Sequence, residues 1–335
     1  MQSRFEKNLV AVCLLFLSSC LFAQQSSSST SVSTASLQGT ATPIPASNPN
    51  QIAILRWYRA NQTATFGVGD GPGQVAFDGS NVWVTNFSSN NVTKLRASDG
   101  ALLGTFPAGP SPSGVAFDGQ NVWVADQSTS SVSMLRASDG RGLGNFPVGF
   151  SPVAVAFDGA NIWVVNLGSN NVSKLRARDG KALGTFLVGA SPQGIAFDGV
   201  NIWVSNTGDS TITKLRASDG TVVGTFTAGT GPVGLAFDGA NMWVANQGGN
   251  NVTKLRASDG AVQGTFPVGS LPQAVAFDGA NIWVTNFSSN SVTKLRASDG
   301  ALIGTFPTGQ FPEGIAFDGA NVWVVNAGSN TVSKH

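Results

Sequence analysis

The sequence predicts an all-β protein, a seven-bladed β-propeller built from four-stranded repeats of 40 residues. The tripeptide Phe-Asp-Gly occurs seven times at a spacing of 40 residues, beginning at Phe77, and a tryptophan keeps the same spacing, beginning at Trp83. A fixed period of about 40 residues is the signature of a repeat fold. The composition agrees, because 41 glycines, 8 tryptophans and 21 phenylalanines with only 11% charged residues are typical of a turn-rich β protein.

Each repeat contains four strand-like runs, here named a, b, c and d. In one unit they are residues 114–117, 121–125, 131–136 and 142–147, with Asp-Gly turns after a and after c. Short turns between neighbouring strands require an antiparallel meander, which is a propeller blade. Strand a carries an alanine before its phenylalanine in all seven units, and Gly or Ala two residues earlier in six of them. We therefore expect strand a at the crowded axis and the tryptophan of strand b between blades.

The two ends of the repeat region predict how the ring closes. Residues 52–66 match the c-to-d part of a unit, and residues 332–335 lie midway through a strand c. We predict that residues 62–67 supply strand d of the last blade and close the ring without a covalent bond, which removes two exposed sheet edges. Residues 52–56 and 332–335 both offer strand c of that blade, and the sequence does not choose between them.

The N-terminal residues indicate export. Arg4 and Lys7 precede an apolar run over 9–23, which is short for a membrane span and has the length of a signal-peptide core. Residues 1–23 are therefore predicted to be a signal peptide. We expect the protein outside the cytoplasm, in the periplasm, secreted, or on the outer membrane as a lipoprotein.

Two cleavage sites remain open. Residues 17–20 resemble a bacterial lipobox ending at Cys20, which would make Cys20 a lipidation site, whereas Ala23 is suited to ordinary cleavage. Residues 24–50 are rich in Ser, Thr, Ala and Pro, which predicts a disordered linker before a propeller over 51–335. Since both cysteines precede the linker, no disulfide is expected in the propeller.

The turns of a propeller lie on two faces, and here only one of them varies. The a–b and c–d turns, which we call the uniform face, hardly change between units and contain 13 of the 18 acidic residues, for which capping of tight turns is the expected role. The b–c and d–a connections, the variable face, differ in every unit. Either recognition, with phenylalanines as anchors, or neutral drift explains this. The candidate ligand-binding residues all lie on the variable face: Asp70, Phe87, Gln127, Phe150, Gln193, Asp209, Gln247, Gln273, Phe287, Gln310, Phe311 and Glu313.

The sequence offers little catalytic chemistry. The one histidine, His335, is the last residue and is expected far from the axis, so the serines lack a partner for a triad and no catalytic residue is predicted. A carboxylate-only calcium site that uses Asp70, Asp126, Asp209 or Glu313, which lie in four different blades, is the one metal site considered. Asp126 replaces the asparagine of the other six units and is interpreted as a turn cap.

The repeat resembles known families. Residues 83–86 and 283–286 read Trp-Val-Thr-Asn, which resembles the family named for its Tyr-Val-Thr-Asn repeat, and the flanking Pro-x-Gly-Val-Ala-Phe-Asp-Gly resembles NHL repeats and streptogramin B lyase. The likeness covers residues 52–335 and implies a β-propeller. Members include surface-associated binding propellers. The lyase resemblance implies a metal-dependent elimination that uses histidine and acidic side chains, and this chain lacks such a histidine.

Fold, export and inventory together predict a non-enzymatic binding or scaffolding propeller that presents its variable face to a glycan, a peptide or an envelope protein. The alternative is a lactonase- or lyase-like enzyme with the calcium-type carboxylate site. A formal net charge of +1 provides no basic surface for nucleic acid, so none is expected as a partner. We expect a monomer that meets a membrane only through the lipid anchor, with no cofactor other than that calcium ion.

Overall fold

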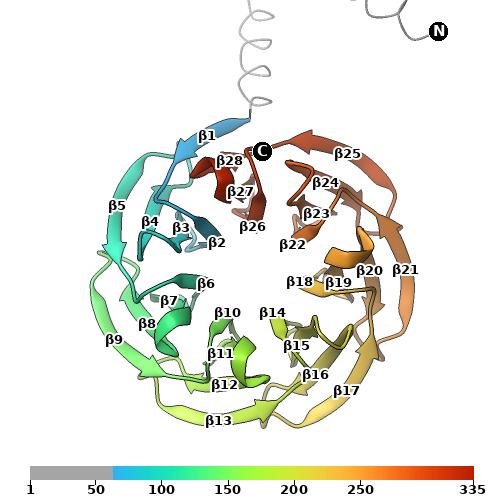
Figure 1. The fold of residues 1–335 in the computed structure, drawn as a ribbon, viewed down its shortest axis with the longest axis horizontal. Coiled ribbons are helices and arrows are strands. Elements are labelled where there is room, and N and C mark those ends of the chain that lie inside the picture. Colours follow the sequence, from blue (N-terminus) through green and yellow to red (C-terminus); the bar gives the residue numbers. More distant parts are fainter. Residues whose placement is uncertain (1–62) are drawn as a thin grey trace, which may run out of the picture. The chain divides into compact units, whose positions relative to one another are not determined.

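The computed structural model describes residues 63–335, which form seven four-stranded antiparallel sheets around one axis (Figure 1). This confirms the predicted seven-bladed β-propeller. The expected signal peptide, Cys20, the linker and the first offered strand c (52–56) lie outside the described residues. The helices among residues 63–335 are three-residue 3-10 turns, none of which is long or apolar enough to cross a membrane.

Each blade runs from strand a at the axis to strand d at the rim (Figure 1). The a strands are β2 (Pro72–Phe77), β6 (Pro112–Phe117), β10 (Pro152–Phe157), β14 (Pro192–Phe197), β18 (Pro232–Phe237), β22 (Pro272–Phe277) and β26 (Pro312–Phe317). The b strands are β3 (Asn81–Asn86), β7 (Asn121–Asp126), β11 (Asn161–Asn166), β15 (Asn201–Asn206), β19 (Asn241–Asn246), β23 (Asn281–Asn286) and β27 (Val322–Asn326).

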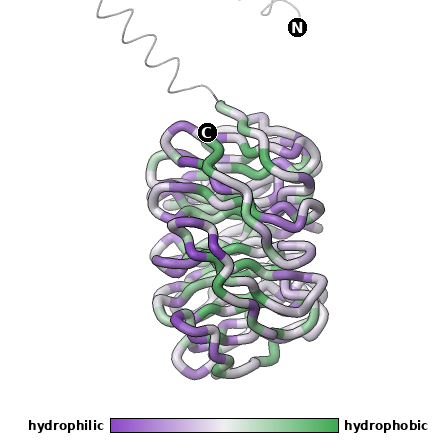
Figure 2. The backbone as a smooth tube through the Cα atoms, turned by 90° about the vertical axis from the view of Figure 1, so that its left-hand side faces the viewer, coloured by the Kyte–Doolittle hydropathy of each residue, from purple (hydrophilic) through white to green (hydrophobic). Residues whose placement is uncertain are grey.

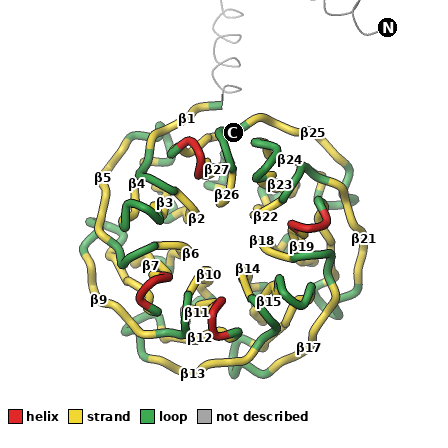
Figure 3. Tube along the Cα trace, viewed as in Figure 1, coloured by secondary structure: helices red, strands yellow, loops and turns green. Residues whose placement is uncertain are grey.

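The outer strands repeat as regularly. The c strands are β4 (Asn91–Arg96), β8 (Ser131–Arg136), β12 (Asn171–Arg176), β16 (Thr211–Arg216), β20 (Asn251–Arg256), β24 (Ser291–Arg296) and β28 (Thr331–Lys334). The d strands are β5 (Leu102–Pro107), β9 (Gly142–Pro147), β13 (Ala182–Leu187), β17 (Val222–Thr227), β21 (Val262–Pro267), β25 (Leu302–Pro307) and β1 (Ala64–Gly67). Four b–c loops form the 3-10 turns η1 (Gln127–Thr129), η2 (Leu167–Ser169), η3 (Gln247–Gly249) and η4 (Ala327–Ser329), shown in red in Figure 3.

The a strands begin two residues earlier than predicted, at the loop proline. Pro112 pairs with Asp126 across an irregularity before Val115, and the other six blades repeat this pairing with an asparagine. A proline is tolerated there because the first residue of a strand need not donate to the ladder. The residue after each proline is thereby held in the inner strand, at the mouth of the axis.

Crowding at the axis explains the small residues of strand a. A Cβ atom at Gly114 would lie 2.6 Å from the Cα of Ala154 in the next blade, and one at Gly314 would lie 2.6 Å from the carbonyl oxygen of Gly73. Real Cβ atoms do not approach other atoms this closely, so a side chain at either position would push the inner strands apart. The expected narrow axis is confirmed.

The hydrophobic core lies between neighbouring blades, as expected for the tryptophans. Trp123 of blade 2 is fully buried and packs with Ile162, Val164 and Leu175 of blade 3. In side view, the strands carry most of the hydrophobic colour and the turns most of the hydrophilic colour (Figure 2). The indole Nε1 also donates a hydrogen bond of 2.8 Å to Asp118 Oδ2 in the a–b turn, and all seven units share this bond, which the sequence did not suggest.

Lysines on strand c add a polar link between blades. Lys94 Nζ lies 4.9 Å from the centre of the Trp83 ring and donates a 2.6 Å hydrogen bond to the carbonyl oxygen of Ala137 in the next blade. The charge is thus desolvated against a ring face and a carbonyl dipole, an arrangement that compensates for burial. The uniform face carries these links because Ala137 directly follows strand c.

Closure of the ring follows the prediction. The last sheet has the order β1-β28-β27-β26, and β1 pairs antiparallel with β28, Phe66 opposite Val332. Strand c of this blade is therefore the C-terminal one, which decides the question the sequence left open. Lys334 Nζ donates to the carbonyl oxygen of Ala97 at 2.7 Å, so the last blade is joined to the first as the others are joined.

Candidate ligand-binding site

An axial channel of about 420 Å³ runs between the inner strands. The residue after each loop proline lines its variable-face end in six of the seven blades, and these residues are Ser113, Val153, Gln193, Val233, Gln273 and Glu313. The next ring of the wall is small, except that Gln74 stands where the other blades have Gly or Ala. The positions that differ between units therefore meet around one opening.

A second cavity of about 350 Å³, the mouth cavity, lies over blades 7, 1 and 2. Its lining contains Phe87, Gln127 and Glu313 from the predicted set, and it shares Gln74, Ser113 and Glu313 with the axial channel. Gly73 leaves room there, because a Cβ atom at this position would lie 3.7 Å from Glu313 Oε2. The other six blades carry a side chain at the equivalent position.

Among residues 63–335, Glu313 is the only ionisable residue that lines either cavity. Burial raises the pKa of its carboxyl to about 7. Glu313 is partly buried, and within residues 63–335 no side chain forms a hydrogen bond or an ion pair with its carboxylate, whereas charges that are removed from water in proteins are normally paired. A positively charged partner in the cavity would therefore stabilise the ionised form of Glu313.

Gln74 is a site residue that the sequence reasoning missed. It lines both cavities, and its Oε1 lies close enough to the last blade to be 3.2 Å from a Cβ atom at Gly314. The available signal was the single exception to Gly or Ala at this ring of strand a. This exception can be interpreted only in the closed ring, where blade 1 lies beside blade 7.

Aromatic side chains flank the mouth cavity. Phe87 lines it and is 43% exposed, and Phe311, which is 44% exposed, precedes Pro312 and Glu313 in the chain. The Phe311 ring stacks on Phe287 at a centroid distance of 5.0 Å. Exposed rings beside a cavity are typical of recognition surfaces.

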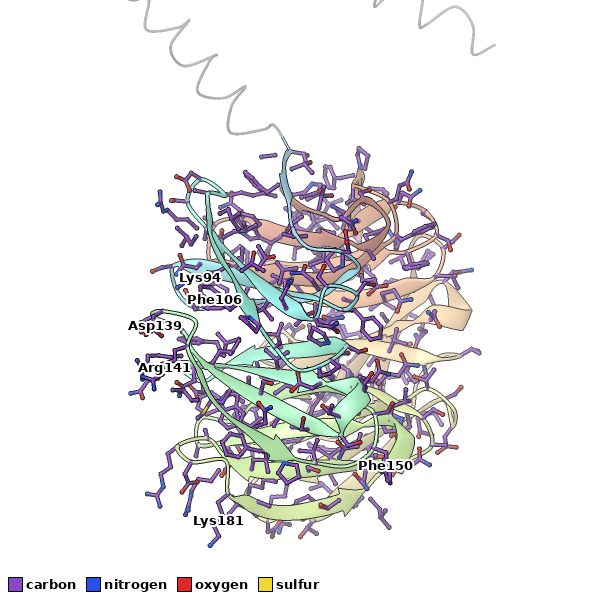
Figure 4. All side chains as sticks on the ribbon, turned by 60° about the vertical axis from the view of Figure 1, so that its left-hand side comes forward. Lys94, Phe106, Asp139, Arg141, Phe150 and Lys181 are labelled. Atoms are coloured by element: carbon purple, nitrogen blue, oxygen red, sulfur yellow. The ribbon has the colours of Figure 1, made fainter. Side chains whose placement is uncertain are left out.

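The other predicted site residues lie outside both cavities. Phe150 is 72% exposed and occupies the opposite side of the disc from Asp139, Arg141 and Lys181 of the uniform face (Figure 4). Gln247 begins η3, and the backbone N–H of Gln310 donates a hydrogen bond to Ser329 Oγ. The predicted set thus divides into members at the cavities, which are Phe87, Gln127, Gln193, Gln273 and Glu313, and a peripheral remainder.

Asp70 and Asp209 have structural partners. Asp209 Oδ2 accepts the backbone N–H of Ala190, the role that Ser89 Oγ has for Asp70. The Asp70 carboxylate accepts Asn330 Nδ2 at 2.9 Å across the closure of the ring. These hydrogen bonds account for both carboxylates without a role in ligand binding.

The four carboxylates considered for calcium do not form a site. Within residues 63–335 no group of three or more His, Cys, Asp or Glu side chains lies close enough to hold a metal ion. Asp126 does not cap the b–c turn that it begins, because its side chain forms no hydrogen bond to η1. Its side chain is fully buried and accepts Ser133 Oγ at 2.6 Å, since the end of strand b points into the blade rather than to solvent.

The other sequence expectations for polar groups agree with the structure. Asp118 Oδ1 accepts the backbone N–H groups of Gln120 and Asn121, which is the predicted turn capping. His335 lines neither cavity. Burial lowers the pKa of its imidazole to about 4, and the ring lies 6.4 Å from Trp283, centroid to centroid.

Comparison with known proteins supports the fold. No family model matches the sequence, and no curated protein matches it. Solved structures do match. Streptogramin B lyase has a TM-score of 0.71 at 18% identity over 82% of this chain and 96% of its own. The fold is that of the streptogramin B lyase-like propellers.

Two further structures agree. Virginiamycin B lyase from Staphylococcus aureus has a TM-score of 0.71 at 19% identity, covering 82% of this chain and 98% of its own. Hydrazine synthase from Kuenenia stuttgartiensis has the same TM-score at 18% identity, covering 79% and 95%. The predicted resemblance to propellers of the Tyr-Val-Thr-Asn and NHL type is thereby confirmed as a likeness of fold, and at these identities it extends no further.

Proposed function

We propose that the protein is an exported, non-enzymatic binding propeller that holds a peptide, a glycan or an envelope protein at the mouth cavity of its variable face. The observation that carries this proposal is the convergence of residues that differ between blades. Phe87, Gln127 and Glu313 come from three blades and line one cavity, which opens beside the axial channel. A concave site with a few polar groups and an aromatic flank suits ligand binding.

The chemistry of the lining favours binding over catalysis. The two cavities are lined by one carboxyl group, by amide and hydroxyl side chains, and by apolar residues, with no histidine, cysteine or lysine among them. Nucleophilic catalysis needs a nucleophile within hydrogen-bond reach of an activating base, and among residues 63–335 no such hydrogen-bonded pair of side chains lines either cavity. Export to the periplasm or beyond, with or without a lipid at Cys20, is the part of the proposal that rests on residues 1–23.

The test compares two exposed phenylalanines of the variable face. The purified protein is screened against envelope glycans, peptides and envelope proteins, and the hits are repeated with Phe87→Ala and with Phe150→Ala. Loss of a ring at the centre of a binding site weakens affinity by about tenfold or more, whereas loss of a peripheral ring changes it by about twofold or less. We expect Phe87→Ala to have the larger effect, and Phe150→Ala serves as the matched control.

Equal affinity of both variants and the wild type for every hit would contradict the mouth cavity as the binding site. Loss of binding in Phe150→Ala alone would place the ligand over blade 3 instead. Both outcomes are read by titration calorimetry on folded protein, with circular dichroism confirming that each variant retains its sheets.

A further inference from the structure

Glu313 is the one acid of the variable face without a structural role. Asp209 accepts a hydrogen bond from a loop backbone N–H, and the Asp70 carboxylate accepts one from Asn330 Nδ2. Asp126 is fully buried and accepts a hydrogen bond from Ser133 Oγ. Glu313 instead lines both cavities, and no described side chain pairs with it. An unpaired carboxylate that is desolvated costs free energy unless a partner of opposite charge arrives.

The two faces of the disc differ in charge. All Lys and Arg residues among 63–335 lie in strand c, at or beyond its fourth residue, or in the c–d turn that follows it. They are therefore on the side of the uniform face, where exposed arginines pair with turn aspartates, as Arg96 does with Asp99 at 2.9 Å. The variable face has no Lys or Arg among the described residues and has four acids. It offers a field that attracts cations and has no competing cation of its own.

The surroundings of Glu313 match an organic cation better than a metal ion. A calcium ion needs six to eight oxygen ligands, roughly, and within residues 63–335 no three His, Cys, Asp or Glu side chains meet. A lysine or arginine side chain needs one carboxylate for its charge, acceptors for its remaining N–H groups and an apolar wall for its methylene stem. The mouth cavity supplies these as Glu313, the amide oxygens of Gln74 and Gln127, and the ring of Phe87.

We propose that the mouth cavity receives a lysine or arginine side chain of a peptide or protein, and that Glu313 forms an ion pair with its charged group. This rests on the proposed function, because it specifies the ligand of the same cavity. Phe87 covers the methylene stem, and Gln74 and Gln127 accept the other N–H groups. The volume of about 350 Å³ accommodates one long side chain, with the rest of the partner over the exposed rings of Phe87 and Phe311.

The test uses two blocked tripeptides that differ only in charge, acetyl-Gly-Lys-Gly-amide and acetyl-Gly-norleucine-Gly-amide. They are titrated into the purified protein labelled with carboxyl-¹³C glutamate. Glu313 is the only glutamate beyond Glu6, and Glu313→Gln assigns its signal. We expect the lysine peptide to shift the Glu313 signal and to bind about tenfold more tightly than the norleucine peptide. An arginine peptide in a third arm shows which cation fits better.

Two variants separate the specific pair from the general field of the face. Glu313→Gln should reduce binding of the lysine peptide to the level of the norleucine peptide. Asp209→Ser, which removes one charge from the same face and introduces the residue that four other blades carry there, should leave it within about twofold. Binding of the lysine peptide should also strengthen from about pH 5 to about pH 8 in the wild type and not in Glu313→Gln.

If the two peptides bind equally well and Glu313→Gln does not change their affinity, the cation inference is overturned. The proposed function would still stand in that case, provided that binding at the mouth cavity remains sensitive to Phe87→Ala. A Glu313 signal unmoved by the lysine peptide at millimolar concentration would overturn it too. Displacement of that peptide by calcium chloride at equal ionic strength would also overturn the cation inference. The same holds for a neutral glycan that binds at the mouth cavity with equal affinity in the wild type and in Glu313→Gln. The proposed function fails separately, when no hit depends on Phe87.

Discussion

Asp126 occupies the end of strand b, where the other six blades have asparagine, and the exchange adds a charge to a buried position. The side chain is fully buried, and burial raises the pKa of its carboxyl to about 6, against the hydrogen bond from Ser133 Oγ. Asp126 Oδ1 has no hydrogen-bond partner among the described residues. The structure gives no functional reason for the charge.

We predict that Asp126→Asn stabilises the protein above about pH 6. Because the folded-state pKa lies above the ordinary value of 3.8 for an aspartate, the folded protein holds the proton more tightly than the unfolded chain, and stability falls as the pH rises between these values. Asparagine removes this loss. The free energy of unfolding in urea should rise by about 1–3 kcal/mol at about pH 8 and change little at about pH 4.

The control is Asp198→Asn in the a–b turn. Burial disfavours the charge of Asp198, but hydrogen bonds from Trp203 and Asn201 outweigh it and lower the pKa of the carboxyl. This substitution should therefore destabilise the protein near neutral pH. A gain in stability from both substitutions, or a loss from both, would contradict the account of Asp126.

At the level of single residues, the sequence predicted the turn capping of the repeated aspartates and the burial of the tryptophans. It did not reveal that both belong to one hydrogen bond, because Asp118 and Trp123 lie on opposite sides of a turn whose twist decides whether they meet. The burial of Asp126 was missed for a related reason. A residue at the end of a strand reads as exposed until the d–a loop at Gly109 is placed against its side chain.

Among the elements, β1 has a role that no other strand shares, because it joins the start of the ring to its end. Its pairing with β28 covers the outer edge of the last blade, and Phe66 packs on Trp323 at a centroid distance of 5.5 Å. Closing a long loop costs entropy that grows slowly with length, so a four-residue strand with one partly buried ring is enough to hold the ends.

We predict that a chain beginning at Gly69 loses cooperative unfolding and self-associates. The edge of β28 would be unpaired, and exposed edges pair with other chains. Size-exclusion chromatography and thermal unfolding compare it with a chain beginning at Gln51, which retains β1. A monomer that melts in one transition at the same temperature as the longer chain would show that β1 is dispensable.

The strands themselves were predictable because the same pattern occurs in all seven repeats, so that features peculiar to one unit do not mislead the prediction. The bounds of strands c and d in the unit containing Trp123 agree with the structure. The a strand is longer by two residues, because it begins at Pro112, which pairs with Asp126 ahead of a bulge. The choice of β28 as strand c depends on pairing across the whole chain, which no local pattern contains.

For the whole molecule, the division into a uniform and a variable face was visible in the repeat, and the structure adds where the variation converges. The predicted residues Gln193, Gln273 and Glu313 line the axial channel, and Phe87, Gln127 and Glu313 line the mouth cavity. The residues of the mouth cavity meet because blades 7, 1 and 2 are neighbours, and this neighbourhood exists only in the closed ring. The role of Gln74 could not be predicted for the same reason.

The pKa of Glu313 in the free protein tests the central claim most directly, since the mouth cavity is proposed to contain an unpaired, partly desolvated carboxyl. It is measured by following the ¹³C carboxyl signal of labelled glutamate with pH, assigned by its absence in Glu313→Gln. The structure predicts a pKa of about 7, falling when the lysine tripeptide binds and unchanged by the norleucine tripeptide. A pKa near the ordinary glutamate value of 4.5 that neither peptide moves would contradict the account.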